Sequence, residues 1–280
     1  MAHSNPGFNQ SPAFSQNNGD LARWQRDQAA ARQPVINGGM SADQLQKLYE
    51  KPSASPVDTD RMTYEDTIAK TVGAFAVLLV GAVAGWFIPG IWIVGGIVGF
   101  ILAMVNIFKK RPSGALVLAY AGFEGLFIGG ISAFFDALWP GIVPQAVFGT
   151  LGVFATTLAL FASGKVRASR RATQIFLVAM VGYAAYALVN FGLQIFGVTS
   201  GTFGLSSLTV FGIPIGVVIG LVVVLMAAYS LVLDFTQIKT GVDRGAPRIF
   251  GWTAAFGLIV TIVWLYTEIL RLLALLRGNN

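Results

Sequence analysis

Long apolar runs recur after residue 66, and they constrain the fold of this chain more than any other feature. A helix of about 20 apolar residues crosses the roughly 30 Å hydrocarbon core of a bilayer. Turn-forming residues such as Pro89-Gly90 and Trp139-Pro140-Gly141 separate the runs. The sequence therefore predicts an all-α membrane protein with seven transmembrane helices, near residues 68–88, 91–108, 114–138, 144–163, 173–196, 210–236 and 251–276.

The charge content excludes most classes of soluble protein. Only 11% of the residues are charged and 55% are hydrophobic, whereas ordinary globular chains carry about 25% charged residues. The isoelectric point of about 9.7 is basic, but the basic residues lie in short clusters between the apolar runs, which is typical of membrane topology. We therefore expect the lipid bilayer as the partner of this chain, and no nucleic acid.

The basic clusters also predict an orientation. Lys and Arg gather at alternate connections, and the opposite connections carry none, apart from Arg271 and Arg277 near the C-terminus. Cytoplasmic loops carry the excess of Lys and Arg. The sequence predicts a multi-pass protein of the cell membrane with the N-terminus in the cytoplasm and the C-terminus outside. The clustered residues are Arg61, Lys70, Lys109, Lys110, Arg111, Lys165, Arg167, Arg170, Arg171, Lys239, Arg244 and Arg248.

Residues 1–66 differ from the rest of the chain, residues 67–280. They are polar and hold 6 basic and 8 acidic residues, a composition that buries too little apolar surface to offset the entropy of ordering. We expect a largely disordered cytoplasmic tail, with one short helix at Ser41–Glu50 capped by Ser41. A docking segment for other membrane proteins is the alternative interpretation of the same residues.

Catalytic side chains are scarce. The chain has no cysteine, and its one histidine, His3, lies in the tail. Neither a disulfide framework nor His-based catalysis is available, and no nucleophile–base pair stands out. We expect no enzymatic activity and no cofactor.

Small residues four apart recur in the predicted spans, for example Gly81 and Gly85, or Gly125 and Gly129. Residues at this spacing share one helix face and allow two helices to approach closely. We interpret them as packing positions.

Three acidic residues remain inside the spans, namely Glu124, Asp234 and Glu268. A carboxylate at mid-helix costs about 2.5–3.5 kcal/mol on insertion scales, and such residues commonly mark ion or proton paths. The one basic residue near them is Arg271. Carboxylates without a fixed counter-ion either hold a proton or attract a mobile cation.

Short motifs around these acids resemble a known family. Residues 233–238 read LDFTQI, residues 264–273 read WLYTEILRLL and residues 119–125 read AYAGFEG. These segments resemble motifs of the Bax inhibitor family, the transmembrane Bax inhibitor motif proteins, in its bacterial type. The resemblance covers about residues 70–280 and leaves the tail outside.

The resemblance implies a fold in which the last helix is central and is wrapped by two layers of three helices. It also implies a pH-sensitive calcium leak in which two acids form a proton-controlled latch. Carried over, Asp234 and Glu268 are the latch and the candidate metal ligands, with Ca²⁺ as the permeant ion. Glu124, Gln237 and Arg271 are candidates for lining the pore or cavity. The second acid here is Glu, and the 34-residue separation is roughly ten longer than we expect for simpler members.

Other interpretations of the acids stay open. Glu268 and Arg271 are three apart on a helix and are placed to pair with each other, while Asp234 lies close enough to the interface to be solvated. Glu124 is either a cavity-lining acid or a protonated packing element. If Lys239 and Arg248 mark the same interface, the helical rise puts Asp234 and Glu268 roughly 20 Å apart in depth.

Three functions compete on this evidence. The first is a calcium or cation leak, the second a non-transporting modulator that binds other membrane proteins, and the third a proton-coupled transporter. The acid-rich interior and the resemblance favour the first. The third lacks the pair of interrupted helices that marks a substrate site in many transporters.

Overall fold

The computed structural model describes residue 26 and residues 60–88, 90–199, 203–210 and 212–278. The described part contains seven long helices, a hairpin of two strands with two residues each, and two short 3₁₀ helices, η1 at Gly204–Ser207 and η2 at Arg248–Phe250. The tail, the helix expected at Ser41–Glu50 and most of the segment 1–66 lie outside the described residues. The long helices are α4 (Tyr64–Phe87), α5 (Ile91–Phe108), α6 (Gly114–Leu138), α7 (Ile142–Ala162), α8 (Arg170–Ile195), α9 (Ile215–Asp243) and α10 (Gly251–Arg277).

All seven helices are long and apolar enough to cross a membrane, which confirms the predicted spans. The first begins at Tyr64, earlier than predicted, because the Thr63 side chain caps it by accepting a hydrogen bond from the Asp66 amide at 3.1 Å. The protein is a multi-pass, all-α membrane protein.

The sixth span differs most from its predicted bounds of 210–236. Strands β1 (Thr209–Val210) and β2 (Ile213–Pro214) pair as an antiparallel hairpin, and α9 starts only after Pro214. At the other end the helix continues to Asp243, supported by an ion pair between Lys239 and Asp243 at 2.7 Å. The last two turns of α9 are polar, so the hydropathy of the sequence falls before the helix itself ends.

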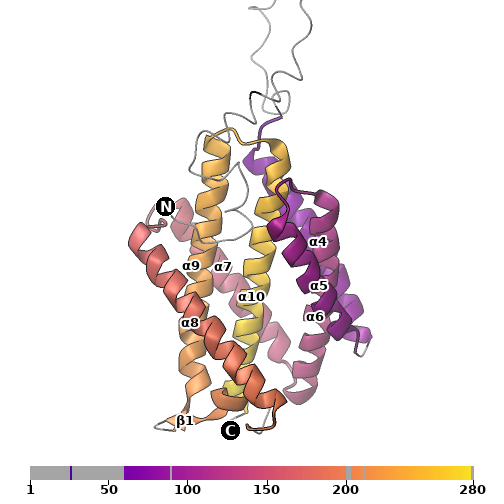
Figure 1. Cartoon of the computed structure of the whole chain (residues 1–280), viewed down its shortest axis with the longest axis vertical. Coiled ribbons are helices and arrows are strands. Elements are labelled where there is room, and N and C mark those ends of the chain that lie inside the picture. Colours follow the sequence, from indigo (N-terminus) through magenta and orange to yellow (C-terminus); the bar gives the residue numbers. More distant parts are fainter. Residues whose placement is uncertain (1–25, 27–59, 89, 200–202, 211, 279–280) are drawn as a thin grey trace, which may run out of the picture.

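Helix α10 is the most buried of the seven candidate spans. Figure 1 shows it running between α4–α6 on one side and α7–α9 on the other. Its principal packing partners are α9, α4, α7 and α6. The expected central last helix between two three-helix layers is confirmed.

Glycines allow α4 and α6 to pack backbone against backbone. A Cβ added to Gly125 would lie 2.1 Å from the carbonyl oxygen of Leu78, and one added to Gly129 would lie 1.9 Å from that of Ala82. No side chain fits at such distances, so these positions require glycine. The packing role predicted for Gly125 and Gly129 is confirmed, whereas Gly212, predicted to pack in the same way, lies before α9, and a Cβ added to it would have nothing within 4 Å.

At one end of the bundle, the segment that precedes α4 is hydrogen-bonded to the connection between α9 and α10. Met62 is buried, and its amide donates to the carbonyl of Ala246 at 2.6 Å, while the Arg248 amide donates to the carbonyl of Asp60 at 2.8 Å. The Arg248 Nε also pairs with Asp66 Oδ1 at 2.8 Å. These contacts hold the connection between α9 and α10, the two helices that carry the buried acids.

Candidate functional site

Asp234 lies on α9 and faces the central helix. Its side chain is completely buried, and its Oδ2 accepts a hydrogen bond from Thr261 Oγ1 of α10 at 2.6 Å. The interpretation of Asp234 as a solvated residue at the interface is therefore wrong. The α9–α10 packing that holds this carboxylate places it inside the protein, next to a hydroxyl donor.

Glu268 lies on α10 itself and is 3% exposed. Tyr183 of α8 donates its hydroxyl to Oε2 at 3.0 Å, and Arg271 Nε donates to the same oxygen at 3.3 Å. Arg271 Nη2 also forms an ion pair with Oε1. The pairing expected from the three-residue spacing is confirmed, and it gives Glu268 a fixed counter-ion.

The two acids lie at different levels of the bundle. Thr261, which bonds Asp234, precedes Glu268 by seven positions on the same helix, a rise of about 10 Å. The separation in depth is about half of that inferred from the basic residues. It is smaller because α9 continues past Lys239 to Asp243 before the chain turns. In the described conformation each acid has partners of its own.

A cavity of about 400 Å³ lies beside Glu268. Arg271 Nη1 donates to Ser206 Oγ at 3.4 Å, and Tyr186 shares a 2.7 Å hydrogen bond with the same oxygen. Polar groups from α8, η1 and α10 thus converge at one level. The cavity's polar lining consists of Tyr183, Asn190, Gln194, Ser206, Thr267, Glu268 and Arg271.

The other two candidate lining residues have different surroundings. Glu124 is half-buried on α6, with its carboxylate against α5, since a Cβ added to Gly99 would lie 3.0 Å from its Oε2. Gln237 is half-buried on α9, about one turn beyond Asp234. Of the candidates, Arg271 joins Glu268, whereas Glu124 faces a peripheral helix.

Within the described residues, no group of three or more His, Asp or Glu side chains is placed to hold a metal ion. Cation binding by Asp234 and Glu268 stays a prediction, and it requires a conformation in which each acid exchanges its present partners for the ion. Oxygen ligands from these acids and neighbouring hydroxyls are of the type that Ca²⁺ prefers.

Three residues around the two acids were not picked out in the sequence, namely Thr261, Tyr183 and Ser206. Thr261 was within reach, because a residue seven positions before Glu268 lies on the same helix face two turns away. Tyr183 and Ser206 come from other parts of the chain and carry no local signal. Their positions depend on how α8 and η1 pack around α10.

The fold and the buried acids define a class, that of seven-helix membrane proteins with carboxylates held against a central last helix. The family model described as "Bax inhibitor 1 like" matches residues 5–278. The chain belongs to this family, and the match extends toward the N-terminus well beyond the resemblance, which began near residue 70. A comparison with curated proteins found no match.

Proposed function

We propose that the protein is a pH-sensitive cation leak of the cell membrane, with Ca²⁺ as a permeant ion. The observation that carries the proposal is the complete burial of the Asp234 side chain against the central helix. A buried acid in a membrane helix is costly, and it is retained where it serves ions or protons. Membership of the Bax inhibitor 1 like family supports the same reading.

In this proposal the cation meets two carboxylates in sequence. Glu268 borders the cavity of about 400 Å³ and is the first. Asp234 is the second, about 10 Å further along α10. The proposal uses two separate carboxylate positions, which is supported by the contacts of Asp234 with Thr261 and of Glu268 with Arg271; the latch that the resemblance implies stays a prediction.

Arg271 keeps the described conformation closed to cations. Its guanidinium forms an ion pair with Glu268 and donates a hydrogen bond to Ser206 Oγ. A cation can bind Glu268 only after Arg271 moves away, because the two positive charges compete for the same oxygens. Conduction therefore requires displacement of the Arg271 side chain.

Protons regulate the leak by discharging the carboxylates. A protonated acid loses the charge that attracts a cation, so the flux falls as the pH decreases. The charged and titratable groups facing Glu268 are Arg271 and Tyr183. Asp234 accepts a hydrogen bond from the Thr261 hydroxyl, and in this proposal the pH dependence arises from the two carboxylates.

The test is Ca²⁺ flux into liposomes that contain the purified full chain. Asp234→Asn should lower the flux about tenfold, equivalent to about 1.4 kcal/mol in the barrier. Asp243→Asn is the matched control, since Asp243 is an exposed acid of the same helix with its side chain 55% accessible. Equal flux for Asp234→Asn and the wild type would contradict the proposal. Absence of flux in the wild type would favour the modulator.

The proposal includes an orientation with the N-terminus in the cytoplasm. Arg277 Nη1 donates to the carbonyl of Pro140 at 2.9 Å, so the C-terminal end of α10 lies beside the α6–α7 connection, which we place outside. The cysteine-free chain allows a direct test with Pro140→Cys and Lys110→Cys. An impermeant maleimide should label the first on intact cells and the second only after lysis; the reverse would invert the topology.

A further inference from the structure

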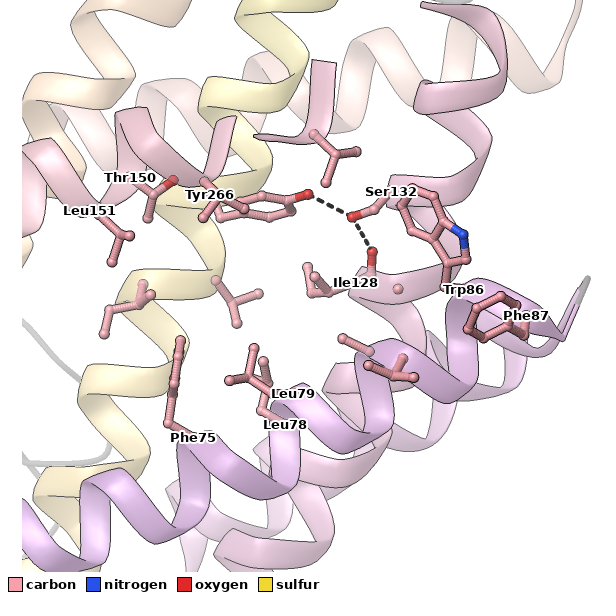
Figure 2. A pocket seen from close by; sticks show the side chains of 17 residues that line it. Phe75, Leu78, Leu79, Trp86, Phe87, Ile128, Ser132, Thr150, Leu151 and Tyr266 are labelled. Atoms are coloured by element: carbon pink, nitrogen blue, oxygen red, sulfur yellow. Dashed lines mark hydrogen bonds between the residues drawn. The ribbon is translucent and has the colours of Figure 1, made fainter. Parts of the chain in front are cut away.

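A second, apolar groove lies on the lipid-facing side of the bundle. It has a volume of about 590 Å³, and it is bounded by α4, α6, α7 and α10. Leu79 of α4, Leu151 of α7 and Tyr266 of α10 line it (Figure 2). Val83 of α4 and Val147 of α7 are also lining residues. The groove is separate from the cavity beside Glu268.

The groove exists because α4 and α7 pack on different neighbours. Helix α4 is drawn onto α6 by the glycine contacts, whereas α7 packs mainly on α10 and α9. The side chains of α4 and α7 therefore leave a space between the two helices, and they line it from both sides. In a membrane such a space is filled by lipid, since an empty void forfeits van der Waals contacts on one side.

The three hydroxyl groups in the lining are already bonded within the protein. The Ser132 hydroxyl shares a 2.6 Å hydrogen bond with the Tyr266 hydroxyl and donates to the carbonyl of Ile128, also at 2.6 Å (Figure 2). Thr150 Oγ1 donates to the carbonyl of Ala146 at 2.8 Å. These hydroxyls therefore make no demand for a polar ligand, and the lining includes no charged side chain that would hold a free carboxylate.

The groove is continuous with the surface that faces the bilayer. Val83 is 61% exposed and Leu151 is 53% exposed, so both walls open sideways into the lipid-facing belt. Along α4 the lining extends from Phe75 to Phe87, a rise of about 18 Å. One leaflet's share of the hydrocarbon core is about 15 Å. The length matches a single extended acyl chain.

We propose that this groove binds one acyl chain of a membrane phospholipid as a retained ligand, with the headgroup left outside the groove. Because lipid tails are as apolar as the lining, retention comes from shape and van der Waals packing. The acyl chain would lie against Val263 and Tyr266 of the central helix. A phospholipid is favoured over a free fatty acid because the lining offers no basic side chain.

The test uses the full chain purified in detergent, with dioleoyl-phosphatidylcholine added at limiting concentration. Native mass spectrometry should show one phospholipid adduct that persists as other lipids dissociate. Val83→Trp and Leu151→Trp each insert an indole into the groove and should lower its occupancy about tenfold, or about 1.4 kcal/mol. Val178→Trp is the matched control, because Val178 of α8 is 75% exposed and lies outside the groove lining.

A second measurement covers the case in which the tryptophan variants fail to fold. Wild-type protein in nanodiscs containing a phosphatidylcholine with a diazirine on its acyl chain should crosslink preferentially to the groove lining rather than to the exposed face of α8. Uniform labelling of both faces would overturn the proposal. Equal adduct retention by the groove variants would also overturn it, as would a dimer of the chain in place of the lipid adduct.

Discussion

Replacing Arg271 by alanine should destabilise the protein and open the Glu268 position. The side chains of Glu268 and Arg271 are 4% and 21% accessible, so the pair is largely shielded from water. Unit charges 3.3 Å apart, the distance from Arg271 Nε to Glu268 Oε2, attract by about 5 kcal/mol at an effective dielectric constant of about 20. Removing one member of a buried pair typically costs about 3–5 kcal/mol. We expect Arg271→Ala to fall in this range at neutral pH.

The assay is a double-mutant cycle on the free energy of unfolding in mixed micelles. Glu268→Gln removes the stranded charge, so the double variant Glu268→Gln/Arg271→Ala should recover most of the loss. Arg271→Lys keeps the charge and should be the mildest variant.

The refuting result is additivity. If Glu268→Gln and Arg271→Ala destabilise independently, with no coupling energy between them, Arg271 does not act through Glu268. In that case the closed state described above would lose its basis. In liposomes, Arg271→Ala should raise the Ca²⁺ flux, because the fixed cation no longer occupies the carboxylate.

Other substitutions test the packing around the site. Gly129→Ala places a methyl group 1.9 Å from an α4 carbonyl and should cost about 1–3 kcal/mol, whereas Gly152→Ala, with nothing within 4 Å, should be neutral in the same unfolding assay. Tyr266→Phe removes one buried hydroxyl contact and should cost about 0.6 kcal/mol in detergent. Asp66→Asn removes the charge that pairs with Arg248 and should speed amide hydrogen exchange in the α9–α10 connection.

The helices could be predicted because the hydrocarbon core of the membrane requires helical segments that are apolar over one characteristic length. Helices α5 and α6 begin and end where the sequence places them, at Ile91–Phe108 and Gly114–Leu138. Proline and glycine separate the apolar runs, and each run is long enough to span the bilayer. The end of α9 was not predictable from hydropathy, since its last turns are polar and are supported by the Lys239–Asp243 pair.

The site was predictable only where its contacts are local. Glu268 and Arg271 are three apart on one helix, so their pairing follows from helix geometry. The contact between Asp234 and Thr261 joins α9 to α10, and its register depends on the length of the intervening turn. The same limit applies to Tyr183, which reaches Glu268 from α8. Such contacts arise from packing that no local pattern encodes.

The most direct measurement of the central claim is Ca²⁺ flux in liposomes as a function of pH, compared between the wild type and the double variant Asp234→Asn/Glu268→Gln. The account predicts a wild-type flux that falls on acidification and a double variant with low flux at every pH. The amides imitate the protonated acids and cannot titrate. A double variant with the flux and the pH dependence of the wild type would contradict the claim that these two carboxylates carry and gate the cation.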